Sequence, residues 1–418
     1  MSTDWFQGAG LGIFVHWDHA SQQGLEVSWP LVGGNFALTE GQTVTVEQYH
    51  SSAATFDPTA WDAPAFARTA RDTGATYAVL TTKHHSGYAM FHTKLSDFSI
   101  EHAPFGRDIV REFVDAVRAE GLRVGLYFSL SDWSAPDYPP FTEANKPYQF
   151  GLSPPAPGAE QWDRYLEFMF GQITELLTNY GRIDVLWFDG GWERAPAQWR
   201  GRELIDLIHS LQPDILVNDR LPGFGDYATP EQFIPPQPLE RAWETCMTMN
   251  ESWGYNPTDT HYKSARALIH SLCEVAGRGG NLLLNVSPRG DGTLPPEQQE
   301  RLQVVGAWMR AHGESVTGTV AGLEPWQFYG PSTRRGDRVY LHLLMRPYDT
   351  VTVRGVPIRR VQSVRALATG AELAHTTRTG IIDSLTQDPN GELAIEVPTD
   401  ILDDNVTVLA VDFAPATA

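Results

Sequence analysis

Short apolar runs recur along the first three quarters of the chain, with stretches of helical periodicity between them. The run from Ile183 to Phe188 is apolar except for Asp184, and Gly181 and Gly190 lie just outside it. Such a run between turn residues is typical of a strand buried in a parallel sheet. Similar strands are predicted at residues 11–17, 75–85, 122–133, 214–220, 242–249 and 281–288.

Each gap between these strands is long enough for a helix. A proline opens the helix predicted at 58–73, and a pair of prolines opens the one predicted at 295–313. Strands that alternate with helices form a parallel sheet. The predicted strands end in polar residues, and no glycine-rich phosphate turn follows the first one. We therefore predict an α/β fold with a (β/α)8-like, TIM-type barrel, with irregular strands allowed, over residues 1–324. The other helices are expected at 107–120, 160–180, 197–211 and 260–278.

The pattern changes near residue 325. Short, alternating strands with turn residues between them are predicted from there to the end of the chain, which favours a small antiparallel β-sandwich over residues 325–418. No strand in this part ends in a cluster of acids, histidines and tryptophans. We expect this second domain to support the barrel and to take no part in the chemistry. Its strands are predicted at 339–345, 350–356, 361–367, 393–398 and 406–413.

Composition narrows the class of protein. The net charge of −20 argues against a nucleic-acid or membrane partner. No basic segment followed by an apolar stretch opens the sequence, and no run reaches the ~18 apolar residues of a membrane span. Cys246 and Cys273 fall in apolar patterns, so we expect buried free thiols. These features favour a cytoplasmic protein, and its oligomeric state is left open.

The candidate chemistry begins at Asp189, where the buried run ends. A carboxylate in this position costs free energy unless something there uses it. In a β/α barrel that end of the strand lies at the mouth, where active sites are found. Three tryptophans lie close in sequence, Trp187, Trp192 and Trp199, and flat aromatic faces beside a carboxylate suit a sugar ring. A helix cap or loop acid would explain a single such Asp equally well, so the other strand ends decide.

Polar side chains also follow the other strands. The first strand ends near His16, the second at His84 and His85, and the third contains Tyr127. One histidine on an apolar strand is usually a core residue. Three at strand ends, together with Asp189, favour a shared site.

Further along the chain, Arg220 follows the fifth strand, Glu231 lies in the loop after it, and Glu244 lies on the sixth strand. Two carboxylates among His, Arg, Tyr and Trp side chains are typical of glycoside hydrolysis. Histidine and carboxylate also bind zinc or manganese, but no HExxH or HxH spacing is present. Adjacent His84 and His85 would point to opposite faces of a strand unless the strand has ended. A metal-dependent sugar isomerase and a non-catalytic carbohydrate-binding barrel remain as alternatives.

An ordered set of short motifs carries a family resemblance. The chain contains GIFVHWD, VSWP, TTKHHSGYAMFHTK, GLYFSLSDW, VLWFDGGW, VNDR, TPEQ, WETCMTMNESWGY and GRGGNLLLNVSPRGDG. From about residue 5 to about residue 330 it resembles the α-L-fucosidases of glycoside hydrolase family 29. The resemblance implies a retaining exo-enzyme that removes terminal α-L-fucose from oligosaccharides by double displacement, with no cofactor and no metal.

The resemblance also assigns residues. It implies that Asp189 is the nucleophile and that Glu231 is the best match for the general acid/base, with Glu244 as the rival. Many family members have a Glu beside the tryptophan of the SWP motif, where this chain has Ser28, with Glu26 nearby. Together with TPEQ, this departure resembles the subgroup that acts on branched α-1,3/1,4-linked fucose. The implied sugar-binding residues are His16, Trp29, His84, His85, Tyr127, Arg220 and Trp253, and Trp192 joins them from its place beside Asp189.

Overall fold

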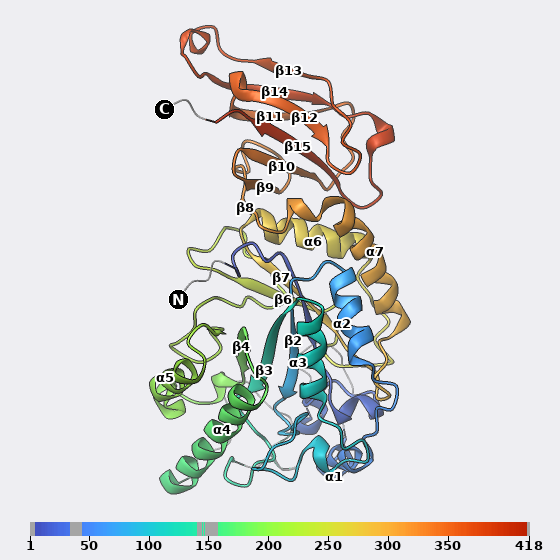
Figure 1. Cartoon of the computed structure of the whole chain (residues 1–418), viewed down its shortest axis with the longest axis vertical. Coiled ribbons are helices and arrows are strands. Elements are labelled where there is room, and N and C mark those ends of the chain that lie inside the picture. The colour runs from blue at the N-terminus through green and yellow to red at the C-terminus, as the bar shows by residue number, and fades with distance from the viewer. Residues whose placement is uncertain (1–4, 34–43, 140–143, 145, 147–157, 416–418) are drawn as a thin grey trace.

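The computed structural model describes residues 5–33, 44–139, 144, 146 and 158–415. Seven parallel strands form a curled sheet in the order β5-β4-β3-β2-β1-β7-β6 (Figure 1), which confirms the predicted fold class. Each strand lies inside an apolar run, and nearly every residue in it is buried. The strands are β1 (Leu11–Val15), β2 (Tyr77–Lys83), β3 (Arg123–Ser129), β4 (Val185–Asp189), β5 (Leu216–Val217), β6 (Glu244–Met247) and β7 (Asn281–Val286).

An irregular segment, residues 227–231, completes the wall between β5 and β6. We call it the closing segment. Its first residue forms a parallel bridge with Asn218, just after β5, and its last residue forms one with Cys246 of β6. The Cys246 N–H also donates to the Pro230 carbonyl at 3.2 Å. The backbone of Glu231 is therefore fixed by pairing with the neighbouring strand.

Helices pack around the sheet, and capping residues set where they begin. The helix predicted from residue 58 begins at Ala63, because the Asp62 carboxylate accepts the Ala65 N–H and Pro64 occupies the first turn. The helix predicted from 260 likewise begins after its cap, Ser264. The helices are α1 (Val46–Ser51), α2 (Ala63–Asp72), α3 (Ile109–Ala119), α4 (Ala159–Asn179), α5 (Gly201–Leu211), α6 (Ala265–Gly277) and α7 (Pro296–His312). None of the helices in the described residues is long and apolar enough to cross a membrane.

Two antiparallel sheets follow the barrel and enclose a core of their own, as the alternating pattern predicts. The unpredicted strands β8, β9 and β13 are short, and exposed positions predominate in them, so they show no apolar alternation. The domain boundary at residue 325 stays a prediction. One sheet, in the order β12-β15-β10-β9-β8, contains β8 (Val320–Ala321), β9 (Ser332–Arg335), β10 (Arg338–Leu343), β12 (Val361–Ala366) and β15 (Thr407–Phe413). The other, in the order β11-β14-β13, contains β11 (Thr350–Pro357), β13 (His375–Arg378) and β14 (Asn390–Glu396).

The β12-β15-β10-β9-β8 sheet packs against α6 and α7, at the end of the barrel opposite to the one where the arrowheads of β2 and β3 point (Figure 1). Trp308 of α7 is buried there and donates its indole N–H to the Val406 carbonyl at 2.8 Å. The strand ends that carry the candidate chemistry therefore face away from the second domain. Most of the loop predicted to border the site, residues 134–158, lies outside the described residues.

Candidate active site

Side chains at the C-terminal ends of the strands line a cavity of about 230 Å³. Ligand pockets for drug-sized molecules usually measure ~300–1,000 Å³, so this cavity suits one small ring. Every predicted site residue except Glu244 lines it. The lining residues are Phe14, His16, Trp29, His84, His85, Tyr127, Trp187, Asp189, Trp192, Arg220, Glu231, Cys246 and Trp253.

Asp189, the last residue of β4, has its carboxylate in this cavity. The Tyr127 hydroxyl donates to its Oδ2 at 2.9 Å, and Arg220 Nη1 lies 3.4 Å from its Oδ1. Burial raises the pKa of Asp189, while Arg220, the Tyr127 hydroxyl and the Gly190 N–H each act to lower it. The carboxylate is thus taken out of water and held by two donating side chains.

Arg220 links the two candidate catalytic carboxylates. Its Nη2 donates to Glu231 Oε2 at 2.8 Å, so one planar guanidinium contacts both Asp189 and Glu231. The same group is fixed from behind, because Nε donates to the Thr229 hydroxyl at 3.0 Å and the guanidinium lies over the Trp187 ring. Glu231 is exposed at the cavity mouth, whereas Asp189 lies deeper.

Glu244 lies beneath the cavity. It is the first residue of β6, so its side chain lies one layer below the strand ends, and it is fully buried. It accepts hydrogen bonds from Trp187 Nε1 at 2.8 Å and from the Tyr77 hydroxyl. Burial raises the pKa of Glu244 to about 7. The structure shows that it holds Trp187, which forms part of the cavity wall.

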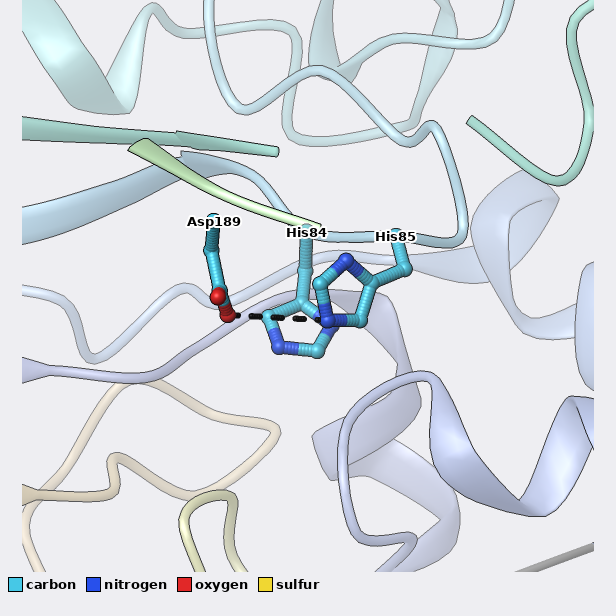
Figure 2. Close-up of side chains that lie close together, drawn as sticks. All are labelled: His84, His85 and Asp189. Carbon is cyan, nitrogen blue, oxygen red and sulfur yellow. Dashed lines mark ion pairs between the residues drawn. The ribbon is translucent and has the colours of Figure 1, made fainter. Parts of the chain in front are cut away.

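The three predicted histidines meet around the cavity as neutral rings. Burial is the main cause that lowers the pKa of His16 and of His85 to about 3, and it lowers that of His84 well below its usual value. The strand β2 ends at Lys83, so the adjacent His84 and His85 no longer alternate between faces. Figure 2 shows both rings beside Asp189, with His85 Nε2 3.6 Å from Asp189 Oδ2.

Aromatic rings form the walls. The Tyr127 ring stacks between His84, at 5.5 Å, and Trp187, also at 5.5 Å. The edges of Trp29 and Trp192 each approach His85, both at 5.4 Å. Trp199 was expected beside Trp187 and Trp192 but lies buried outside the cavity lining, where its indole N–H donates to the Gly191 carbonyl at 2.8 Å. Its role in the loop after β4 is therefore structural.

Sequence reasoning missed several residues of the site. Phe14 lies two residues before His16 on β1 and faces the same way, so strand alternation could have found it. Cys246 lies two residues after Glu244 on β6 and lines the cavity as a buried free thiol. Asn285, on β7, lies 2.7 Å from His16 Nδ1 and had no signal in the sequence beyond its place in a buried strand.

The site contains a group of metal-ligating type, formed by His84, His85 and Asp189. Its donors are poorly suited to a cation. The guanidinium of Arg220 stands beside Asp189, with Nη1 3.4 Å from Oδ1. A divalent ion there would face a fixed positive charge. The second such group in the described residues, Glu251, Asp259 and His261, is largely exposed and lies outside the cavity lining.

Known proteins that are similar to this chain in sequence and in fold include alpha-L-fucosidases. The alpha-L-fucosidase family model matches residues 1–314. The chain is 30% identical over 331 residues to an alpha-L-fucosidase of Dictyostelium discoideum, covering 74% of this chain and 68% of the relative. Alpha-L-fucosidase isoenzyme 1 from Paenibacillus thiaminolyticus is 36% identical with a TM-score of 0.84, over 99% of both chains. The Thermotoga maritima alpha-fucosidase, solved with a mechanism-based inhibitor, is 28% identical with a TM-score of 0.78, over 98% of this chain and 96% of that one. The chain therefore belongs to the alpha-L-fucosidase family and is a glycoside hydrolase.

Proposed function

We propose that this enzyme is a retaining exo-α-L-fucosidase that works by double displacement. The observation that carries the proposal is that Asp189 and Glu231 share one cavity and one bridging residue, Arg220. Retaining glycosidases use two carboxyl groups, one as nucleophile and one as acid and then base. A cavity sized for one small ring accepts a terminal sugar and not a residue within a chain.

In the first step, Asp189 Oδ attacks the anomeric carbon as the bond to the glycosidic oxygen breaks. Glu231 gives that oxygen a proton, and the fucosyl unit stays attached to Asp189 as an ester. In the second step, Glu231 takes a proton from water, the water oxygen bonds to the anomeric carbon, and Asp189 leaves as a carboxylate. Two inversions give fucose with its original anomeric configuration.

The surroundings of the two carboxylates favour this division of roles. Asp189 is buried and held by Tyr127 and Arg220, as a nucleophile must be held for in-line attack. Glu231 lies at the exposed mouth, where a leaving group departs and water enters. We assign Glu244 a supporting role, because its carboxylate is committed to Trp187 and Tyr77 and has no access to the cavity.

We assign sugar recognition to the side chains that surround Asp189. The neutral rings of His16, His84 and His85 can each form a hydrogen bond with a ring hydroxyl. Trp29, Trp192 and Trp253 supply the apolar faces that the ring and the 6-methyl group of fucose require.

The finer proposal is a preference for branched α-1,3- or α-1,4-linked fucose, and Ser28 supports it. Many family members have a Glu beside the tryptophan of the SWP motif, where this chain has Ser28. The Ser28 hydroxyl contacts His84 Nδ1 at 2.7 Å and accepts the Ser86 N–H at 2.8 Å. The serine therefore orients a histidine and adds no third carboxylate to the cavity. The leaving sugar would then be selected by groups at the mouth.

Release of fucose from a substrate panel tests the whole proposal. The panel contains 2′-fucosyllactose, the Lewis a and Lewis x trisaccharides, α-1,6-fucosyl-GlcNAc and an aryl fucoside. We expect the fastest release from the Lewis trisaccharides, with NMR showing α-fucose as the first product. Faster release from the α-1,6 disaccharide or the aryl fucoside would refute the linkage preference, and β-fucose as first product would refute retention.

Two further arms of the same assay address the alternatives. Full activity after treatment with EDTA is expected, whereas loss with EDTA and recovery with a divalent ion would favour the isomerase. Binding of fucose without release from any substrate would favour a non-catalytic sugar-binding barrel.

A further inference from the structure

We infer that Asn285 and Ser129 fix the proton positions of two cavity histidines, so that His16 and His85 each present a bare Nε2 lone pair to the ligand. Both rings would then accept hydrogen bonds from the sugar and donate none. The inference deepens the proposed function, on which its ligand half rests. Its structural half concerns the protein alone.

The argument for His16 begins at a backbone carbonyl. Asn285 Nδ2 lies 2.7 Å from the Trp253 carbonyl oxygen, which can only accept, so the amide nitrogen must face it. The Asn285 oxygen therefore faces His16 Nδ1, at 2.7 Å. An amide oxygen also only accepts, so the proton of the neutral ring must be on Nδ1. The His16 Nε2 is left without a proton, on a residue that lines the cavity.

The argument for His85 begins at another carbonyl. The Ser129 hydroxyl lies 2.6 Å from the Ser131 carbonyl oxygen and donates its single proton there. The same hydroxyl oxygen lies 2.6 Å from His85 Nδ1 and can now only accept from it. The proton of His85 is therefore on Nδ1. If the proton were on Nε2 instead, the bare Nδ1 of His85 and the Ser129 oxygen would be two acceptors 2.6 Å apart with no proton between them.

With its proton on Nδ1, the His85 ring has an acceptor atom, Nε2, beside the carboxylate of Asp189. His85 Nε2 is buried, forms no hydrogen bond within the described residues, and lies 3.6 Å from the carboxylate of Asp189. Two acceptors at that distance both gain when a hydroxyl group donates between or beside them. The ligand must therefore bring hydroxyl protons to this part of the cavity, which a polyhydroxylated sugar does.

His84 provides an internal contrast. Its Nδ1 contacts the Ser28 hydroxyl, which accepts the Ser86 N–H and whose own proton contacts no carbonyl within the described residues. That proton is free to bond His84 Nδ1, so the network does not dictate the tautomer of His84. Of the three cavity rings, His16 and His85 are fixed because the group facing their Nδ1 can only accept from it.

The structural half is tested by long-range ¹H–¹⁵N NMR of the protein labelled at histidine nitrogen, with peaks assigned through His16→Gln and His85→Gln. We expect a protonated Nδ1 and a bare Nε2 for both rings. Ser129→Ala should move His85 toward a mixture of tautomers. The matched change Ser131→Ala keeps the Ser131 carbonyl and removes only the longer contact of the Ser131 hydroxyl with His85 Nδ1, at 3.2 Å, so it should leave the tautomer unchanged. Asn285→Leu should release His16, and Asn285→Asp, which keeps the accepting oxygen, should not. If Asn285→Leu fails to fold, the serine pair alone decides.

The ligand half is tested by competitive inhibition with L-fucose, its 3- and 4-deoxy analogues and its 3- and 4-deoxyfluoro analogues. Fluorine accepts weakly and cannot donate. At a hydroxyl that meets His16 or His85, we expect both analogues to bind at least ~10-fold more weakly than fucose, since a buried acceptor is left unpaired. Fluoro analogues that bind like fucose at both positions would overturn the inference, as would Nε2–H signals from either ring. Failure of every sugar to bind, with the expected NMR spectrum, would instead count against the fucosidase proposal alone.

Discussion

At the scale of single residues, Arg220 governs the electrostatics of the cavity. A guanidinium cannot lose its proton in a protein, so its charge is present at every pH at which the enzyme folds. It lies against both carboxylates and is itself held by Thr229. Three predictions follow from this arrangement of charge.

Asp189→Ala should lower kcat by ~10³-fold or more, because no group remains to form the covalent intermediate. Azide should restore turnover by entering the space left by the carboxylate, and NMR should identify β-fucosyl azide as product. A variant with near-normal turnover, or with an α-azide, would end the assignment of Asp189 as nucleophile.

The loss of activity in Glu231→Ala should depend on the leaving group of the substrate. Loss of the proton donor should lower kcat for a trisaccharide by ~10²-fold or more and affect an activated aryl fucoside much less, since that group leaves without a proton. Glu244→Gln is the matched comparison. It disturbs the hydrogen bond that holds Trp187 from below and should lower kcat for both substrates alike. If the two variants show the reverse pattern, the roles of Glu231 and Glu244 must be exchanged.

Arg220→Met should move the acidic limb of the kcat/KM profile to higher pH. The nucleophile must be ionised, so activity falls as pH falls through the pKa of Asp189. Burial already raises that pKa, and Arg220 opposes the rise more than the Tyr127 hydroxyl does. Removing the positive charge raises the pKa further. Tyr127→Phe should shift the limb in the same direction by a smaller amount, and a shift to lower pH in either variant would contradict the account.

At the scale of elements, the barrel wall has one irregular part, the closing segment, and Glu231 is its last residue. The next residue, Gln232, has a φ of 52°, in the left-handed region that costs a non-glycine residue about 1 kcal/mol. Its side chain compensates by donating to the Thr248 hydroxyl at 2.8 Å, and its N–H donates to the Cys246 carbonyl at 2.9 Å. The turn therefore anchors the candidate acid to β6.

Gln232→Gly should loosen this anchor without strain, because glycine adopts the same φ freely. We expect kcat to fall by roughly 10-fold on a trisaccharide, since a small misplacement of a catalytic group is costly. An aryl fucoside should be hydrolysed nearly as fast as by the wild type. Steady-state kinetics on the two substrates measure the ratio, and an equal loss on both would mean that the turn serves stability and not the acid.

Elements also show where prediction from the sequence succeeds. Long apolar runs such as those of β1, β2 and β7 are visible because every position in them is buried. The closing segment is not visible, because its sequence has no strand periodicity and its pairing depends on strands far along the chain.

The depth of a side chain within the barrel is harder to predict from the sequence than the face of the sheet on which it lies. Glu244 and Asp189 both lie on strands, but one begins its strand and the other ends its strand, and only the end reaches the mouth. The alternation of side chains along a strand predicts on which face of the sheet a residue lies. Its position along the strand determines how deep in the barrel it lies. Trp199 was misjudged for a similar reason, since closeness in sequence to Asp189 did not place it in the cavity.

At the scale of the whole molecule, buried ionisable groups should give stability a maximum near neutral pH. Burial raises the pKa of Glu26 to about 8, of Glu244 to about 7 and of Asp18 to about 6. The folded state thus keeps protons that the unfolded state has lost, and stability falls as pH rises toward 8. Burial conversely lowers the pKa of several histidines from 6.5 to about 3. Between these two values the unfolded state binds protons that the folded state does not, so stability falls as the pH falls from about 6.5 toward 3. These histidines are His16, His19, His85 and His342.

We therefore expect the Tm to be highest between about pH 6 and 7 and to fall on both sides. Calorimetry from pH 4 to pH 9 measures the curve. Glu26→Gln should flatten the alkaline side, because that group no longer titrates, and leave the acidic side in place. A Tm that rises steadily to pH 9 would show that the buried acids stay ionised in the folded protein.

The placement of the second domain, on the end of the barrel opposite the cavity, has a practical consequence. An enzyme fixed to a bead or chip through the β11-β14-β13 sheet would have the C-terminal ends of β2 and β3 turned outward (Figure 1), and the cavity lies at those strand ends. Bulky glycoproteins could then approach it from the open side without meeting the support. Attachment at the opposite end, through residues of α1, would turn the same molecule over and restrict it to small, freely diffusing sugars.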